Sequence, residues 1–226
     1  MKSRVLFTSL LMASSISISI AHAEDGLSTE KQKLSYAVGI QIGQDLKRND
    51  MDIDTASIAM AIDDVMAGSE PKLTMEEMQT LFSDYQQREM AKKELAAQAN
   101  KAEGEAFLEK NKGKDGVTVL PSGLQYKVIT AGTGKQPTVE STVSVHYRGT
   151  LLNGAEFDSS YKRGAPATFP VNGVIKGWTE ALQLMKEGAK WQLFIPSGLA
   201  YGTRGAGADI GPNSVLTFDV ELLSIE

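Results

Sequence analysis

The chain has 226 residues and a formal net charge of −5 at neutral pH, which is enough length for one large domain or two modest ones. It contains no cysteine, which excludes disulfides, a thiol nucleophile and lipidation of an N-terminal cysteine. The acidic balance, without a dense Lys/Arg cluster, argues against nucleic acid as a partner.

Residues 1–23 have the pattern of a secretory signal peptide: Lys2 and Arg4 precede an apolar, serine-rich stretch that ends in Ala21-His22-Ala23. A membrane anchor is the alternative, but the strongly apolar part is short for a bilayer span. We therefore expect cleavage and export to the periplasm, with association at the outer membrane or cell surface left open. Cleavage would remove the positive charges of Lys2 and Arg4, so the formal net charge of the mature chain would be −7 instead of −5.

Residues 24–112 are predicted to be helical, because they contain a single proline and few aromatic residues. A first helix should follow the capping box formed by Thr29 and Gln32, with Gly39 and Gly43 on one face where another helix can approach closely. A second helix should begin after Asp54 as N-cap and stop at Gly68.

A second capping box, Thr74 with Glu77, opens a helix expected to run to about Asn111, a length of roughly 55 Å. Its first half carries an apolar stripe. Residues 91–114 instead combine alanine and charge nearly all round, which is typical of a solvated strut between domains.

The apolar stripes of these helices are interpreted as core rather than as a cofactor site. Some fifty residues make a thin core for one chain, so a second copy is expected to complete it. The hypothesis is a dimerisation domain at 24–73, a connecting helix at 74–112, and a homodimer formed through residues 24–90.

From about residue 117, β-branched and aromatic residues alternate between glycines and prolines. Asn153-Gly154 predicts a hairpin within 141–160. The other expected elements are strands near 117–130, 167–171, 190–196 and 215–225, and a short helix at 174–185. The fold class is therefore α+β, with residues 113–226 forming an antiparallel sheet wrapped on one short helix.

Residues 113–226 show few arrangements of side chains that are typical of nucleophilic, acid–base or metal chemistry. The only histidine of the mature chain, His146, should point away from the side on which Val145 and Tyr147 face inward, and no catalytic triad or metal-ligand set can be built around it. No metal or cofactor is expected. The glycines of 202–211 are interpreted as a flexible loop, because no helix follows them.

Six aromatic residues stand at strand ends, a helix start and a loop, where they can serve as core or can line an apolar pocket suited to binding. They are Tyr147, Phe157, Phe169, Trp178, Tyr201 and Phe218.

The motifs VHYRG, FDSSYKRG, VIKGW, AYG and TFDVEL, in this order, resemble the FKBP-type peptidyl-prolyl cis-trans isomerases, which bind macrolides. The segments SYAVGIQIG, GEAFLEKN and VLPSGLQYKV resemble the macrophage infectivity potentiator branch, whose members are exported homodimers. The resemblance covers essentially the whole mature chain.

The resemblance implies a catalytic pair, Asp158 and Tyr201, in which Asp158 pairs with Arg163 and accepts from Tyr147 while Tyr201 bonds a substrate carbonyl. It implies Trp178 as the pocket floor. The remaining implied substrate-binding residues are Phe157, Phe169, Val174, Ile175, Ile210 and Phe218.

Ala167 and Ala206 depart from the family, whose drug-binding members often carry bulkier residues there, so the pocket is expected to be more open to solvent. The expected partners are unfolded or proline-containing polypeptides and macrolides such as tacrolimus and rapamycin.

Asp158 is expected to be ionised and to shape the pocket wall; a purely structural ion pair is the alternative.

Two functions remain open from the sequence. One is a prolyl isomerase that assists folding of exported proteins. The other is a dimeric, chaperone-like binding module with incidental isomerase activity.

Overall fold

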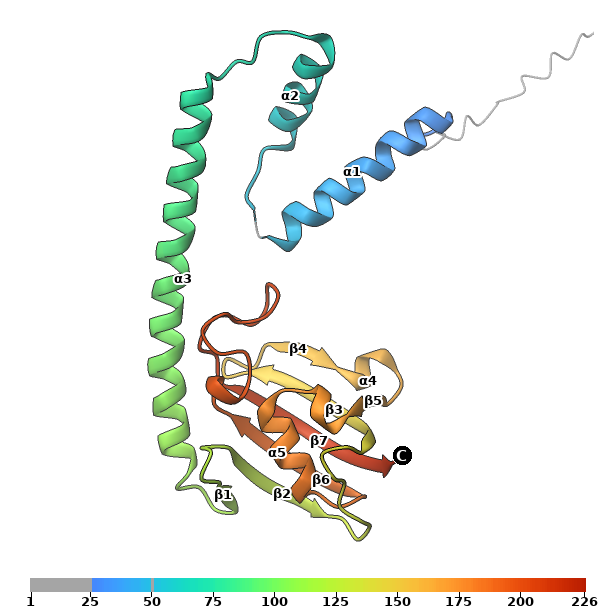
Figure 1. Ribbon diagram of the computed structural model, residues 1–226, viewed down its shortest axis with the longest axis vertical. Helices are drawn as coiled ribbons and strands as arrows, with labels where there is room; N and C mark the ends of the chain where they lie inside the picture. The colour runs from blue at the N-terminus through green and yellow to red at the C-terminus, as the bar shows by residue number, and fades with distance from the viewer. Residues whose placement is uncertain (1–25, 50) are drawn as a thin grey trace, which may run out of the picture. The chain divides into compact units, whose positions relative to one another are not determined.

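The computed structural model describes residues 26–49 and 51–226 (Figure 1). The expected signal peptide lies outside these residues. None of the helices described is both long and apolar enough to cross a membrane. Among the described residues, those up to Lys47 form one compact unit and those from Arg48 onward form another.

Helix α1 spans Glu30–Arg48 and begins at the expected capping box. The Gln32 amide donates to Thr29 Oγ1 at 3.2 Å, and the Thr29 amide donates back to Gln32 Oε1 at 2.9 Å. These reciprocal bonds satisfy donors that have no partner within the helix, which is why the helix starts here.

Helices α2 (Thr55–Ala67) and α3 (Met75–Asn111) also begin and end where local signals predict. Asp54 accepts from two backbone amides of the first turn of α2, and Gly68 ends that helix in the left-handed conformation with φ of 68°. Thr74 and Glu77 form the capping box of α3. The predicted helical half is confirmed.

The apolar stripes of these helices do not make an ordinary core within one chain. Neither α1 nor α2 contains a buried residue. Leu34 in α1 is 66% exposed and Phe82 in α3 is 65% exposed. Exposure in the single chain is what a core completed by a second copy requires, so the interpretation of the stripes as core stays a prediction.

Seven strands form one antiparallel sheet in the spatial order β1-β2-β6-β7-β3-β4, with β5 paired to β3. The strands are β1 (Val117–Val119), β2 (Gln125–Ala131), β3 (Thr142–Leu151), β4 (Glu156–Ser159), β5 (Ala167–Pro170), β6 (Ala189–Ile195) and β7 (Leu216–Ile225). The α+β class is confirmed.

The β3–β4 connection is the hairpin that Asn153-Gly154 predicts. The Leu151 amide donates to Ala155 O at 2.9 Å, and the Asn153 side chain accepts from the Ala155 amide at 3.0 Å. Gly154 takes a φ of 84°, which a residue with a side chain adopts only with strain.

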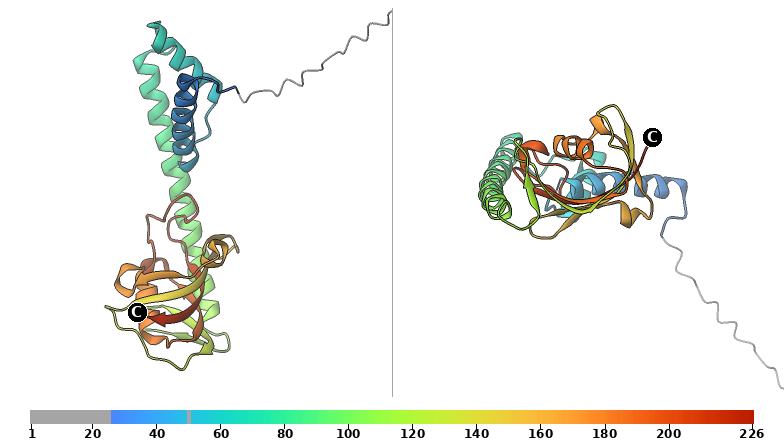
Figure 2. Two further views of the ribbon diagram at one scale, coloured as in Figure 1. Left: turned by 90° about the vertical axis from the view of Figure 1, so that its right-hand side faces the viewer. Right: turned by 90° about the horizontal axis from the view of Figure 1, so that it is seen from below.

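Helix α5 (Lys176–Leu184) lies against one face of the sheet (Figure 1 and Figure 2). Its buried residues Trp178, Ala181 and Leu182 join a core to which the strands contribute every second residue. In β3 these are Val143, Val145 and Tyr147; in β7 they are Leu216, Phe218, Val220 and Leu222.

The last turns of α3 pack on the sheet domain, so the prediction of a strut solvated on every side is wrong there. Gly104 and Asn111 are buried. The Phe107 ring lies 5.8 Å from that of Phe194, a β6 residue that points away from the α5 face by the two-residue period. The Asn111 side chain donates to Gln125 Oε1 at 3.0 Å.

Gly149 in β3 allows two aromatic rings to meet at the sheet surface. A Cβ built at this position would lie 2.6 Å from Phe157 Cζ and 2.7 Å from Phe218 Cε1. These two rings pack edge to face with their centroids 5.4 Å apart. The Phe218 ring also packs against Trp178 at 5.2 Å, so it cannot move away from an added methyl group without disturbing that contact.

We expect Gly149→Ala to lower the free energy of unfolding by about 1–3 kcal/mol, because the added methyl overpacks the contact between the rings. Urea denaturation of the mature protein measures the change. Ser144→Ala on the same strand is the control, with an expected change within about 0.5 kcal/mol. A Gly149→Ala protein as stable as the parent would contradict the close approach.

Candidate active site

A cavity of about 630 Å³ opens between α5, the sheet and the loops at one end of it. Its volume is in the range typical of small-molecule and peptide sites. Ten sequence-predicted positions line it: Tyr147, Phe157, Asp158, Phe169, Val174, Ile175, Trp178, Tyr201, Ile210 and Phe218. Arg163 is not among the lining residues and reaches the site through Asp158.

Trp178 is the hub of the aromatic packing in this cavity. Tyr147 and Phe218 each meet the indole nearly perpendicularly at 5.2 Å, and Phe169 does so at 6.1 Å. Because edge-to-face contacts are the favoured geometry for aromatic pairs, the rings fix one another. Trp178 is placed by the first turn of α5, where its amide donates to Ile175 O at 2.9 Å.

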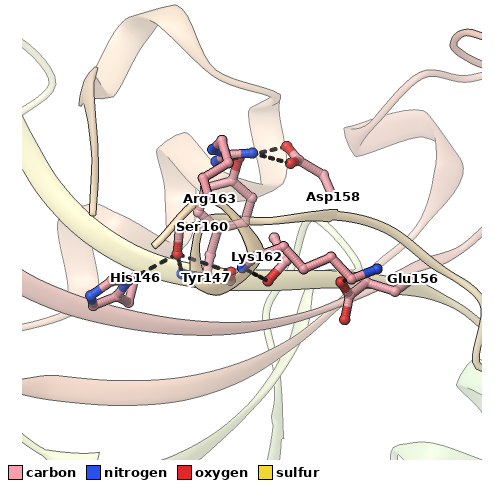
Figure 3. Close-up of polar contacts among 8 residues, drawn as sticks. His146, Tyr147, Glu156, Asp158, Ser160, Lys162 and Arg163 are labelled. Atoms are coloured by element: carbon pink, nitrogen blue, oxygen red, sulfur yellow. Dashed lines mark hydrogen bonds and ion pairs between the residues drawn. The ribbon is translucent and has the colours of Figure 1, made fainter. Parts of the chain in front are cut away.

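The polar wall is a network of three side chains (Figure 3). Tyr147 Oη donates to Asp158 Oδ2 at 2.5 Å and accepts from Arg163 Nη2 at 2.6 Å. Arg163 Nη1 also forms an ion pair with Asp158 Oδ1. The guanidinium carbon lies 5.3 Å from the centre of the Tyr147 ring, a cation–π distance.

A short helical turn, α4 (Ser160–Arg163), brings Arg163 back to Asp158. It ends at Gly164, whose φ of 74° is in the left-handed region. Ser160 ties the turn to β3, because its hydroxyl accepts from the Tyr147 amide at 2.8 Å. The sequence prediction contained no helix here, since four residues are too few to show a helical period.

Asp158 is held in its ionised form. Burial alone would raise the pKa of this carboxyl, but the hydrogen bonds from Tyr147 and Arg163 and the charge of Arg163 outweigh it, so the pKa lies below its usual value. Burial, followed by the hydrogen bond to Asp158, raises the pKa of Tyr147. The tyrosine therefore keeps its proton and remains a donor.

The mouth of the cavity is formed by residues 200–211. Tyr201 is 40% exposed, and Ala206 lines the opening. Three further lining residues were absent from the sequence prediction: Gly173, Gly207 and Asp209. The sequence signal for the last two is the glycine-rich composition of this loop, which favours a flexible loop. In the structure the loop contains an internal bond, from the Ala206 amide to Ile210 O at 2.8 Å.

His146 lies outside the cavity, as the two-residue period predicts. Its ring stacks on Tyr161 at 4.7 Å, and Nδ1 is 3.0 Å from Ser160 Oγ. The side chain is partly buried rather than fully at the surface.

The arrangement favours binding and orientation over proton transfer. Both oxygens of Asp158 are engaged, and its pKa is lowered, which is the wrong direction for a general acid. The cavity surface is mainly aromatic and aliphatic, with a few polar groups at its edge, as expected for a site that binds an apolar chain segment.

Two family descriptions match most of the chain. Residues 31–128 match the domain amino terminal to FKBP-type peptidyl-prolyl isomerase, and residues 133–223 match the FKBP-type peptidyl-prolyl cis-trans isomerase domain.

Several relatives are similar over nearly their whole length. The chain is 46% identical to the "Outer membrane protein MIP" of Legionella longbeachae, over 98% of this chain and 97% of that protein. It is 45% identical to the "Peptidyl-prolyl cis-trans isomerase Mip" of Coxiella burnetii, over 91% of each. The crystal structure of FkpA from Escherichia coli is similar with a TM-score of 0.62 and 37% identity, covering 88% of this chain and 98% of that one.

The ionised state of Asp158 predicts an acid-dependent loss of stability. Its pKa is lowered by folding, so its contribution is fully present above the ordinary value of about 3.9 and is lost as the pH falls through the folded-state pKa. We expect Asp158→Asn to be less stable than the parent by about 1 kcal/mol at pH 7, since the 43% exposed carboxylate is screened by solvent. The difference should vanish at acid pH in urea denaturation.

Arg163→Met supplies the matched test, because it removes the guanidinium and leaves the carboxyl. The pKa of Asp158 should then rise, which NMR of the carboxyl carbon measures directly. An unchanged pKa would mean that Arg163 does not hold the charge on Asp158.

Proposed function

The chain belongs to the FKBP-type peptidyl-prolyl cis-trans isomerases, and we propose that it catalyses its reaction in the aromatic cavity without a nucleophile, metal or cofactor. The observation that carries this proposal is an apolar cavity in which Asp158, the carboxylate of the polar network, has both of its oxygens engaged by Tyr147 and Arg163.

Rotation about a peptide bond costs about 18–20 kcal/mol, because the C–N resonance has to be broken. X-Pro bonds are those for which cis and trans are close enough in free energy for this slow exchange to limit folding. The twisted amide has lost resonance and is less dipolar than the planar one. An apolar cavity therefore disfavours the planar ground state more, which is catalysis by differential binding.

Each site residue has a role in this scheme. Trp178 and its neighbouring rings form the floor and walls that exclude water from the prolyl ring. Asp158 presents a fixed negative charge at the edge of the cavity, where it interacts electrostatically with the substrate carbonyl group. Tyr201, exposed at the mouth, donates a hydrogen bond to a backbone carbonyl of the bound peptide and orients it.

We further propose that the mature protein is a homodimer formed through residues 24–90. The exposed apolar side chains of these helices support it, because large apolar patches on a soluble chain mark interaction surfaces. Gly39 and Gly43 support it as well: nothing lies within 4 Å of a Cβ built at either position, so a partner helix has room to approach.

Export to the periplasm completes the proposal. Its support is the signal-like pattern of residues 1–23 and the similarity to a protein named for the outer membrane. In that compartment the clients would be proline-containing polypeptides that are still unfolded. Small side chains at Ala167 and Ala206 leave the cavity open, so macrolides should bind with fewer contacts than in family members with bulkier residues there.

The exposed helical stripes also favour a second function, a dimeric chaperone-like module that binds unfolded chains while isomerisation is incidental. Variants that abolish isomerisation separate the two functions. If an inactive variant still assists proline-limited refolding fully, the binding function dominates.

We expect Tyr201→Phe to lower kcat/KM for a short X-Pro peptide by about three- to tenfold, because one neutral hydrogen bond to the substrate is lost. Asp158→Leu should lower it by about tenfold or more, since it removes a charged group from the polar network. Tyr161→Phe makes the same chemical change outside the cavity and should leave the rate unchanged. If Tyr201→Phe and Asp158→Leu both fold and keep full rates, the cavity is not the active site.

Deleting residues 24–90 should give a monomer that isomerises short peptides at the rate of the intact protein. The cut lies before Ala97 because α3 contacts the sheet domain from there onward. Refolding of a proline-limited protein should become slower, because a second contact on the helical module raises the effective concentration of the client at the cavity. Sedimentation and refolding rates test this. A monomeric full-length protein, or equal refolding by both forms, would contradict it.

A further inference from the structure

The segment from Ala200 to Val215, which we call the lid segment, joins the cavity to helix α3. Tyr201, Ala206 and Ile210 line the cavity from this segment. Its C-terminal end contacts the last turns of α3, which belongs to the same compact unit. One stretch of chain therefore touches both the bound substrate and the helix that leads away from the domain.

Two backbone bonds tie the start of the lid segment to Ser197 O, one from the Ala200 amide at 2.9 Å and one from the Gly202 amide at 2.8 Å. Within the segment, the Asn213 amide donates to Gly202 O at 2.8 Å. This internal bond closes the segment into a loop directly beside Tyr201. Asn213 is therefore bonded directly to the residue that follows Tyr201, and its position influences the position of Tyr201.

Asn213 also reaches α3. Its side-chain amide donates to Ala97 O at 3.1 Å. From the helix, Asn100 Nδ2 donates to Pro212 O at 2.8 Å. Two adjacent residues of the lid segment, Pro212 and Asn213, are thus fastened to two adjacent turns of α3.

The backbone of Asn213 is adapted to this double role. Its φ of 58° makes it the only non-glycine residue with positive φ among residues 26–49 and 51–226. Asparagine tolerates the left-handed conformation better than most residues. In that conformation its backbone amide bonds Gly202 while its side chain bonds the helix.

Close packing reinforces the hydrogen bonds. A Cβ built on Gly104 would lie 2.6 Å from Val215 Cγ2, so only glycine allows α3 to approach the end of the lid segment this closely. Ala97, Asn100 and Gly104 recur at helical spacing and form one stripe along α3.

We propose that Asn100 and Asn213 are positioning residues for the isomerase reaction, which fasten the lid segment to helix α3 and thereby hold Tyr201 and Ile210 at the cavity mouth. A lid held in its binding conformation loses less conformational entropy when substrate binds, so the fastening acts on KM more than on kcat. The inference rests on the active-site cavity proposed above.

The test compares three variants of the intact mature protein. Asn213→Gly keeps the left-handed backbone and removes the side-chain bond to Ala97. Asn100→Ala removes the bond to Pro212 and favours the helix. Gln98→Ala is the matched control, because its side chain is exposed and bonds Glu94 on the same helix.

We expect Asn213→Gly and Asn100→Ala each to lower kcat/KM for a short X-Pro peptide by about three- to tenfold, mainly through KM. The double variant should lose less than the product of the two factors, since both residues act on one fastening. Gln98→Ala should match the parent.

Amide hydrogen exchange supplies the readout that a general loss of stability would not give. The Ala206 and Ile210 amides, which are bonded within the lid segment, should exchange faster in both asparagine variants, while the amides of β7 keep their parental protection. If both asparagine variants keep the parental kcat/KM and the parental exchange rates of the lid amides, the inference is overturned. It is also overturned if the amides of β7 lose as much protection as those of the lid segment. If Asp158→Leu retains full activity while lid exchange rises as expected, the fastening stands and the cavity assignment fails.

Discussion

The hydroxyl of Tyr147 is the polar group on which the site depends. An aromatic cavity on the face of a sheet removes this O–H from water, and a buried donor without a partner is costly. Asp158 accepts the bond, but a partly desolvated carboxylate needs a positive charge or further hydrogen bonds to offset its lost hydration. Arg163 supplies the charge to Asp158 and a hydrogen bond to the Tyr147 hydroxyl. Since the ring of the same tyrosine packs against Trp178, the polar wall and the apolar floor share one residue. A change at Tyr147, Asp158 or Arg163 is therefore expected to disturb the apolar floor as well as the polar wall.

This network accounts for the presence of a carboxylate in a cavity for which we propose catalysis without proton transfer. Ion pairs removed from water often add little net stability, because desolvation offsets the attraction. What the pair provides here is geometry: the guanidinium, the phenol and the carboxylate each fix the orientation of the other two. In the proposed mechanism, such a fixed charge at the edge of an apolar cavity would not have to reorganise when the substrate amide twists, which is the condition for electrostatic catalysis.

Features encoded by neighbouring residues could be predicted from the sequence almost to the residue. The caps at Thr29, Asp54 and Thr74 and the Asn153-Gly154 hairpin are examples, because each depends on bonds between groups a few positions apart. The strand order could not be predicted, since β2 pairs with β6 across some sixty residues without a local signal. The cavity residues were identified through family motifs. The aromatic pattern alone favours core for each ring taken singly and allows a cavity for the set. Arg163 reaches Asp158 through a turn too short to show a helical period.

The face of α3 that contacts the lid segment was missed for a different physical reason. Apolar periodicity reveals a helix face that is buried by hydrophobic packing, whereas this face consists of an alanine, an asparagine and a glycine. Asn100 donates to the Pro212 carbonyl of the lid segment, and the Ala97 carbonyl accepts from the Asn213 side chain, so both bonds depend on a short asparagine side chain. A lysine would add a charge and a long flexible stem, and a leucine would leave the Pro212 carbonyl without its donor. Asparagine fixes the separation, and glycine at position 104 lets the backbones come within reach of that short side chain. By hydropathy this stripe of α3 is indistinguishable from a solvated surface, yet it binds the helix to the segment that borders the cavity.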